Sequence, residues 1–463
     1  MIVERGRGRA VHIRYRDQDG ERQTLVERDF YPYCFVETAD LHLFDAVYKE
    51  DGYTGLYGEN LTKLVVNDPQ QIMEIQERAD TYGVKTWEAN IPYVNRVLAD
   101  RTNPDDPIPN YDHRIWYLDC EWNPETNALR VMVFHDNFIG ETICLYVNPN
   151  YDATDYASNR TPGRRDSKGR IEFPNEESML RDFLTRLDEA DPDVITGWYV
   201  VGADIKTIAE RLAAVGLSPN GLSPMKRFRY QFGDWSQPIA GINCIDLMIG
   251  FSKLWELKNG KLPGYKLDDV AEIALGEKKV ALPDGHNTYH TDLDLYLDYA
   301  IQDVDLLPKL DAKVNVIGYY TGLQHLVQCD IRATPYITRM FTSLVLQDQK
   351  FLKRIPTKAQ FERVDYQGAD VMEVLPGLYK KIGILDVKAM YHSNAALHNI
   401  SWETLHPDGK DCGNGVRFAQ GGTGLLVRQM DRMTELRDEY KHLMRTDYGN
   451  RARWDAMQYA CKS

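Results

Sequence analysis

Apolar and polar residues alternate in short runs through the first hundred residues of the chain. The segments 10–15 and 31–37 have a period of two, which predicts β-strands, whereas 69–82 opens on a proline and has the spacing of a helix. A cluster of Pro, Asp and Asn over residues 103–110 then interrupts the pattern. We therefore predict a small, β-rich α+β domain over residues 1–108.

After this cluster the pattern changes from separate short strands to strands followed by helices. Residues 114–121 form a mostly apolar run that ends in two acids, and the runs 129–134 and 142–147 follow with the spacing of hairpins. Strands first and helices afterwards predict a mixed sheet with helices on its faces. Three segments carry helical spacing: 178–189, 203–214 and 293–307, the last of which we expect to stop at Pro308.

The last part of the chain has strand and helix patterns of its own. A helix is predicted near 334–352, and the apolar run 381–386 repeats the theme of a strand that ends in an acid. Residues 424–445 have the apolar spacing of a long amphipathic helix, and a second helical pattern, 452–463, is still running where the sequence ends. The whole sequence predicts a multidomain α/β and α+β fold.

Composition narrows the class of protein without choosing a function. The chain has 463 residues and a formal charge of −14, which still permits a local basic groove that binds DNA. No run approaches the ~20 apolar residues of a membrane helix, and no signal-peptide core is present, so we expect a cytoplasmic protein. The 7 cysteines are scattered and never form Cys-x-x-Cys, which argues against disulfides and a zinc site.

Acids at the ends of predicted strands and on a predicted helix are the candidate chemistry. Asp119 and Glu121 lie two apart on a strand, and Tyr299 and Asp303 lie four apart on a helix, so each pair shares one side. Asp204 follows an apolar strand and opens a helix. Each element alone is better explained as a solvated surface or a helix-terminal acid. Together they suit the oxygen ligands that two divalent ions need for phosphodiester hydrolysis.

In this order the three elements resemble the proofreading exonuclease of B-family DNA polymerases, whose motifs are Asp-x-Glu, an Asn-to-Phe-Asp stretch and Tyr-xxx-Asp. The resemblance implies that Asp119, Glu121, Asp204 and Asp303 hold the metals and that Tyr299 positions the attacking water.

The second motif departs from the family pattern. Tyr199 stands where the family usually has Asn, and Ala203 stands where it has Phe or Tyr, although the metal-binding acid is retained. The segment 264–271 is similar to the family's approach to the third motif. We therefore expect an active exonuclease whose grip on the single-stranded primer end, and hence its efficiency, is altered.

A second resemblance concerns the polymerase unit. Residues 366–369 are similar to the family's Tyr-x-Gly-Gly link, and 385–393 followed by 398–401 is similar to polymerase motif A, with His392 where Pro is usual. A buried strand with a lone terminal Asp would be the plainer interpretation. The resemblance implies that Asp386 binds both catalytic metals and that the carbonyl of Val387 binds one of them. It also implies that Tyr391 excludes a 2′-hydroxyl.

The two C-terminal helices resemble the fingers of the family. Arg437 and Lys441 lie four apart on one face and would bind a triphosphate, although a solvated basic face is typical of such spacing too. Lys462 is similar to the lysine that opens motif B, and Ser463 ends the sequence inside that motif. No Asp-Thr-Asp follows motif A, so the second acid of a two-metal polymerase site is missing.

The resemblance therefore implies the N-terminal portion of a B-family DNA-directed DNA polymerase that acts in DNA replication and carries a 3′–5′ proofreading exonuclease. A natural gene split, an intein-related piece and an incomplete sequence remain open, and we favour some form of split. Two other functions also remain open: a stand-alone exonuclease with a vestigial polymerase segment and a non-catalytic DNA-binding assembly subunit. The expected domains are 1–108 N-terminal, 109–325 RNase H-like exonuclease, 326–372 return to the N-terminal domain and linker, 373–423 partial palm with motif A, and 424–463 fingers helices.

The same resemblance implies the cofactor and the partners. All-oxygen ligands favour Mg²⁺ at both two-metal sites, with Mn²⁺ as a substitute. The expected partners are a DNA primer-template, dNTPs and a C-terminal polymerase chain that carries the rest of motif B and the Asp-Thr-Asp motif; a sliding clamp is a further candidate, and a membrane is not. The expected location is the cytoplasm of a prokaryotic cell or of a virus-infected host.

Overall fold

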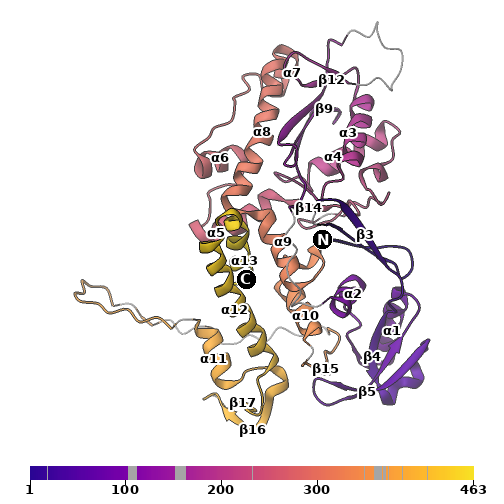
Figure 1. The fold of residues 1–463 in the computed structure, drawn as a ribbon, viewed down its shortest axis with the longest axis vertical. Helices are drawn as coiled ribbons and strands as arrows, with labels where there is room; N and C mark the ends of the chain where they lie inside the picture. The colour runs from indigo at the N-terminus through magenta and orange to yellow at the C-terminus, as the bar shows by residue number, and fades with distance from the viewer. Residues whose placement is uncertain are drawn as a thin grey trace.

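The computed structural model arranges the chain as three neighbouring parts (Figure 1). The seven-stranded sheet and its helices lie at the top of that view, the N-terminal strands at the lower right, and the C-terminal helices at the lower left. The structure describes residues 1–17, 19–102, 112–151, 163–231, 233–348, 350–358, 368, 372–373, 375–387, 389–413 and 415–462.

Two small antiparallel sheets make up the N-terminal part. The predicted helix is confirmed as α1 (Pro69–Tyr82): Asp68 caps its first turn, and Gly83 ends it at a φ of 66°. The helix α2 (Tyr93–Arg101) follows. The first sheet has the order β1 (Ile2–Arg5), β2 (Val11–Arg16), β3 (Arg22–Glu27), and the second has the order β15 (Lys353–Arg354), β5 (Tyr48–Gly55), β6 (Asn60–Val65), β4 (Tyr33–Glu37), β7 (Thr86–Trp87).

A seven-stranded mixed sheet forms the centre of the next part, as the sequence predicts. The strand β8 is antiparallel to β9 and parallel to β13, which is in turn parallel to β14. All three strands predicted between residues 114 and 147 are present. The strand order is β11 (Arg164–Arg165), β12 (Ile171–Phe173), β10 (Glu141–Val147), β9 (Leu129–Asp136), β8 (Ile115–Trp122), β13 (Val194–Gly197), β14 (Asn243–Asp246).

Helices cover both faces of this sheet, and each face has its own apolar core. Residues of β8 alternate between the two cores: Trp116, Leu118 and Cys120 pack toward α3 and α4, whereas Tyr117 packs toward α8. The face of β8 toward α8 is therefore the one that also carries Asp119. The helices are α3 (Glu176–Ala190), α4 (Asp204–Ala214), α5 (Leu247–Asn259), α6 (Leu267–Leu275), α7 (Thr288–Thr291), α8 (Leu293–Val314) and α9 (Val316–Val327).

One predicted helix end is wrong. The helix α8 does not stop at Pro308 but runs on to Val314, where Asn315 takes the left-handed conformation at its end. A proline removes one helical hydrogen bond. The leucines around it, Leu307 and Leu310, are completely buried, so packing of that face outweighs the lost bond.

The C-terminal part contains α10 and a helical hairpin. The hairpin stacks the rings of Tyr440 and Trp454 with centroids 5.8 Å apart. Its second helix packs on α9: Asn315 Nδ2 donates to the Ala452 carbonyl at 2.8 Å, and Met457 lies against Gly322. The elements are α10 (Ile337–Gln347), α11 (Met390–His398), β16 (Leu405–Asp411), β17 (Arg417–Phe418), α12 (Leu425–Thr446) and α13 (Arg451–Ala460).

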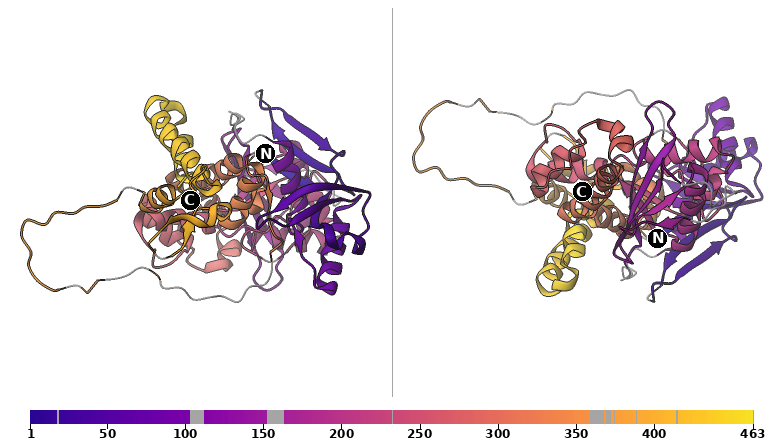
Figure 2. Two further views of the ribbon diagram at one scale, coloured as in Figure 1. Left: turned by 90° about the horizontal axis from the view of Figure 1, so that it is seen from below. Right: turned by 90° about the horizontal axis from the view of Figure 1, so that it is seen from above.

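Two predictions in this part are wrong. The apolar run 381–386 is not a strand, because no neighbouring strand among the described residues pairs with it, and a strand needs such a partner. Figures 1 and 2 show the segment 375–387 extended away from the rest of the molecule. The last predicted helix ends at Ala460, and Cys461 and Lys462 form a turn.

No helix in the described parts of the chain combines the length and the apolar character that a membrane crossing requires.

Candidate active site

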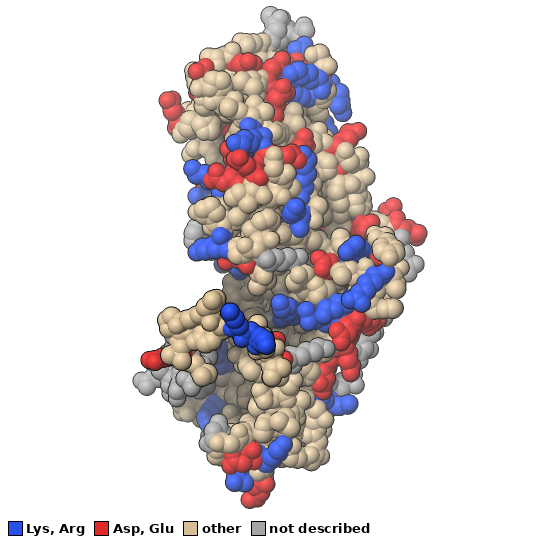
Figure 3. Space-filling view, turned by 90° about the vertical axis from the view of Figure 1, so that its left-hand side faces the viewer, with Lys and Arg blue, Asp and Glu red and all other residues tan. Residues whose placement is uncertain are grey.

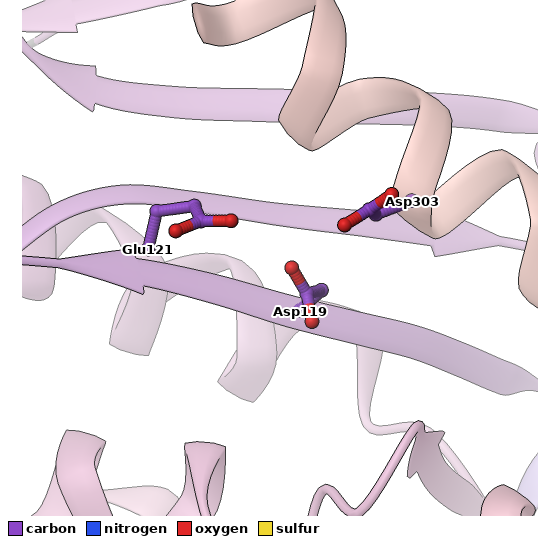
Figure 4. Close-up of side chains that lie close together, drawn as sticks. All are labelled: Asp119, Glu121 and Asp303. Carbon is purple, nitrogen blue, oxygen red and sulfur yellow. The ribbon is translucent and has the colours of Figure 1, made fainter. Parts of the chain in front are cut away.

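Three carboxylates meet between β8 and α8. Asp119 and Glu121 point from the same face of β8, and Asp303 points toward them from α8, with 4% of its surface exposed (Figure 4). One oxygen from each of the three carboxylates lies within 4.8 Å of the other two. The two-residue spacing on the strand and the helix that crosses it thus bring together the acids that the sequence singles out.

Tyr299 lies one turn before Asp303 on α8, as their spacing predicts. A lysine that the sequence analysis missed connects the two: Lys279 Nζ donates to Asp303 Oδ2 at 2.5 Å and to the Tyr299 hydroxyl at 3.3 Å. The lysine and the carboxylate are nearly buried, with 16% and 5% of their side chains exposed. The phenol and the ammonium are therefore held beside one edge of the acid cluster.

Burial and mutual repulsion dominate the electrostatics of the cluster. Burial raises the pKa of Glu121 to about 7, and the charge of Asp303 adds to this rise. Burial, with the neighbouring carboxylates, also raises the pKa of Asp119 well above its ordinary value. For Asp303, burial raises the pKa and the charge of Lys279 opposes the rise. The cluster thus lacks enough positive charge to balance it.

The residues present fit a divalent cation. Asp303 Oδ1 is buried and has no hydrogen-bond partner within the described residues, although a buried carboxylate oxygen normally has one. The donors are all carboxylate oxygens, which hard cations such as Mg²⁺ and Mn²⁺ prefer. A cation in the cluster would complete the coordination of Asp303 and would stabilise the charged form of the carboxylates, which burial disfavours.

Asp204 lies next to this cluster without joining it. It is the first residue of α4, 3% exposed, and its Oδ1 accepts the backbone N–H of Cys120 at 2.9 Å. It is not among the three carboxylates that approach within 4.8 Å, although its charge contributes to the raised pKa of Asp119, for which burial is the larger cause. In the loop before it, Tyr199 has a φ of 67°, which is unusual for a bulky residue.

The proposed polymerase residues lie in two separate places. Asp386 and Val387 lie in the exposed segment 375–387, and Tyr391, in the first turn of α11, is 82% exposed. Among the described residues, Asp386 makes no hydrogen bond and no ion pair and has no second acid in a metal-binding group. Within the described residues, no further group therefore joins Asp386 to form this predicted site.

The other polymerase residues lie on the hairpin. Arg437 and Lys441 lie on α12, where Lys441 is 4.0 Å from Asp438, and Lys462 follows α13. Figure 3 shows acidic and basic side chains mixed over the side of the molecule that faces left in Figure 1, with a hollow near its middle. Charge alone thus does not mark a nucleic-acid path on this face.

Little can be said about the structure of the segment before motif A. Of residues 366–369, which resemble the link between the two units, only Gly368 lies inside the described residues. His392, the departure within motif A, pairs its Nε2 with Asp431 Oδ1 at 2.7 Å and thereby joins α11 to α12.

Sequence reasoning missed three further side chains around the acids, two of which lie in loops without a recognisable spacing. Besides Lys279, these are Tyr296, whose hydroxyl donates to Glu121 Oε2 at 3.3 Å, and His286, whose Nδ1 lies 3.8 Å from the same oxygen. Tyr296 lies seven residues before Asp303 on α8, so helical periodicity is the one signal that could have found it.

Comparisons with known proteins agree with this geometry. The family model described as "DNA polymerase family B, exonuclease domain" matches residues 135–270, and the model "DNA polymerase family B" matches residues 337–463, together more than half of the chain. The fold and the matches are those of the exonuclease domain and of part of the polymerase domain of this family. The chain belongs to DNA polymerase family B.

Individual relatives are distant and longer. The chain is 25% identical to the DNA-directed DNA polymerase of Escherichia phage RB69 over 244 residues, which are 50% of this chain and 27% of that protein. It is 23% identical to the DNA polymerase catalytic subunit of Epstein-Barr virus (strain B95-8) over 431 residues, 78% of this chain and 41% of that protein. The chain thus spans between a quarter and a half of these relatives.

The fold resembles that of a solved polymerase throughout. The family B DNA polymerase of the hyperthermophilic archaeon Pyrobaculum calidifontis superposes with a TM-score of 0.74 and 20% identity, over 99% of this chain and 66% of that chain. At this identity the likeness concerns the fold alone.

Proposed function

We propose that this chain is the 3′–5′ proofreading exonuclease and the N-terminal portion of a DNA-directed DNA polymerase that acts in DNA replication. The observation that carries the nuclease half is the set of three carboxylates within 4.8 Å of one another, covered by α8. The family to which the chain belongs supports both halves.

For the nuclease, two Mg²⁺ ions on Asp119, Glu121, Asp303 and Asp204 would supply a hydroxide nucleophile at neutral pH and would neutralise the scissile phosphate. The chain's own groups do the positioning. The Tyr299 hydroxyl orients the attacking water, and burial raises its pKa, so the phenol stays protonated and can donate. Attack on the terminal phosphodiester breaks the bond to the 3′-oxygen of the preceding nucleotide and releases a nucleoside 5′-monophosphate.

For the polymerase, Asp386 and the Val387 carbonyl would hold Mg²⁺, Tyr391 would exclude a 2′-hydroxyl, and Arg437, Lys441 and Lys462 would bind the dNTP phosphates. A complementing C-terminal polypeptide must add the second acid. The exposed apolar residues of segment 375–387 support this requirement, since such surface is normally covered. They are Leu375, Leu378, Tyr379, Ile382, Ile384, Leu385 and Val387.

One observation favours a second candidate, a stand-alone 3′–5′ exonuclease. The nuclease carboxylates are packed and converge, whereas Asp386 has no partner group among the described residues. In that case the polymerase segment would be vestigial and no complementing polypeptide would restore synthesis.

The test uses the purified chain with Mg²⁺ and an end-labelled primer-template, with and without dNTPs. We expect trimming from the 3′ end, its loss in Asp119→Ala, and no extension. Asp45→Ala is the matched control, because Asp45 is fully exposed and lies in the N-terminal part. A candidate C-terminal polypeptide is then added: extension supports the split polymerase, and continued trimming without extension supports the stand-alone nuclease. Absence of trimming would contradict both.

A further inference from the structure

The N-terminus of α12 is held by side chains from the segment that follows α11. Three of them accept the first N–H groups of the helix, which have no partner inside the helix itself. The pairs are Asn399 with Gly424 at 2.7 Å, Glu403 with Leu425 at 2.5 Å and Ser401 with Leu426 at 3.2 Å. This end of α12 is therefore a fixed point beside α11.

A second contact between the two helices comes from His392, in the first turn of α11 (Figure 1). Its Nε2 lies 2.7 Å from Asp431 Oδ1, and its Nδ1 lies 3.3 Å from Thr434 Oγ1. Both partners lie on α12, one turn apart, and only 20% of the His392 side chain is exposed. The imidazole thus bridges to two positions on one side of α12, a contact that the family's usual proline cannot make.

The hydrogen bonds around His392 define its charge state. Thr434 Oγ1 donates its one proton to the Met430 carbonyl at 2.8 Å, so it can only accept from His392 Nδ1. The carboxylate of Asp431 can only accept as well, so Nε2 must also donate. Both ring nitrogens therefore carry a proton in this arrangement, and His392 is an imidazolium paired with Asp431.

The bridge from His392 to α12 should depend on pH, because histidine is the side chain whose charge changes between pH 5 and 8. On α11, the other titratable side chains are Tyr391 and His398. The other charged groups near Asp431 line one cavity with it; they are Lys350, Arg428, Arg432 and Glu435. When the imidazolium loses a proton, one of its two nitrogens can no longer donate, and the bridge weakens.

The basic residues that we assign to the triphosphate lie on the same side of α12 as the partners of His392. Arg437 follows Thr434 by three residues and Lys441 follows it by seven, so helical periodicity places them on one side. Arg437 Nε is buried and has no hydrogen-bond partner among the described residues. Lys441 lies about 24 Å along the axis from Leu425 at the fixed end, so a tilt of about 10° there moves Lys441 by about 4 Å.

We propose that His392 is a positioning residue: its bridge to Asp431 and Thr434 sets the tilt of α12 and thereby places Arg437 and Lys441 for an incoming dNTP. The proposal rests on the polymerase function proposed above. The fixed N-terminus of α12 leaves the tilt of the helix as its main freedom, and the bridge from the protonated imidazole removes that freedom. Loss of the proton releases it.

The test measures binding of the fluorescent nucleotide mant-dATP, with Mg²⁺, to the full chain at pH 6 and pH 8.5. We expect His392→Gln to weaken binding about 5-fold at pH 6 and to have little effect at pH 8.5. His392→Arg keeps two donors and a permanent charge, so it should bind as well as the unchanged chain at pH 6 and better than it at pH 8.5. His42→Gln is the matched control, because His42 is exposed in the N-terminal part.

A further variant separates positioning from net charge. Asp431→Asn removes a negative charge, so a purely electrostatic effect would tighten binding of the anionic nucleotide. Positioning predicts the opposite: a loss similar to that of His392→Gln at pH 6, with no further loss in the double variant. Amide hydrogen exchange in α12, measured without nucleotide, should be faster at pH 6 in both variants than in the unchanged chain. Circular dichroism checks that each variant is folded.

The outcomes separate this proposal from the function on which it rests. If the unchanged chain binds no mant-dATP, the proposed dNTP site fails and the positioning role fails with it. If the unchanged chain binds mant-dATP, and His392→Gln binds it equally well at pH 6 with the same exchange in α12, the role of His392 alone is overturned. Tighter binding by Asp431→Asn, or an equal loss in His42→Gln, would also overturn that role.

Discussion

Two regions of this molecule carry the acids that we propose for metal-dependent reactions, and their surroundings are opposite. Asp303 is 4% exposed and shares its site with Asp119 and Glu121, whereas Leu385, next to Asp386, is 101% exposed. The acids of the proposed nuclease site come from a sheet strand and a helix that bury each other. The difference teaches that a carboxylate becomes a site when other elements bring further groups to it and remove the water around it.

The largest effect should come from removing an acid of the packed region. Asp119→Ala removes a carboxylate from the centre of the cluster, and we expect the 3′–5′ trimming rate to fall by at least about 10³-fold, measured by gel with an end-labelled single strand. Asp386→Ala, the corresponding change in the exposed region, should leave trimming unchanged. Equal losses from the two substitutions would contradict the contrast between the regions.

A second difference between the two regions is Lys279, which pairs with Asp303. Asp386 has no such partner among the described residues. The ammonium of Lys279 opposes the rise in the pKa of Asp303 that burial causes, so Lys279→Met should raise that pKa further. A larger fraction of Asp303 would then be protonated at neutral pH. We expect trimming at pH 7 to fall about 10-fold and the acidic limb of its pH profile to move to higher pH. Lys278→Met, which changes the exposed neighbour, is the control.

The sequence predicted the packed region better than the exposed one. The strand and helix periods place Asp119, Glu121, Tyr299 and Asp303 correctly, because a period of two or of 3.6 fixes which side chains share a face. Lys279 could not be predicted, since it arrives through a loop, whereas helical periodicity could have placed Tyr296 on the face of α8 that carries Asp303. The strand predicted at 381–386 failed because strand formation depends on a partner strand that no local pattern reveals.

Burial of several acids close together in the packed region should lower the unfolding free energy of the metal-free chain. Burial raises the pKa of Glu121 to about 7, above its unfolded value. The unfolded chain therefore binds fewer protons between these values, and stability without metal should fall as pH rises from about 4.5 through 7. We expect Glu121→Gln to stabilise the metal-free chain at pH 8 by about 2 kcal/mol while it abolishes trimming, as denaturant unfolding and the gel assay would show.

Two control measurements separate this gain in stability from a general effect of removing one negative charge. Glu125→Gln, at an exposed position three residues beyond the strand, should change stability little, and added Mg²⁺ should stabilise the unchanged chain more than Glu121→Gln. If the unchanged chain is equally stable at pH 6 and pH 8 without metal, then the acids of the cluster are not as repulsive as their burial indicates.

The smallest effect should come from the exposed region. Leu118→Ala removes a side chain that is 1% exposed in the core and should cost about 3 kcal/mol of unfolding free energy. Leu385→Ala makes the same chemical change at a site without packing and should cost less than about 0.5 kcal/mol. If a complementing polypeptide covers segment 375–387, Leu385→Ala should weaken binding of that polypeptide even though it hardly changes the unfolding free energy of the isolated chain. A cost above about 2 kcal/mol in the isolated chain would mean that this segment is already packed, and the contrast between the two regions would then fail.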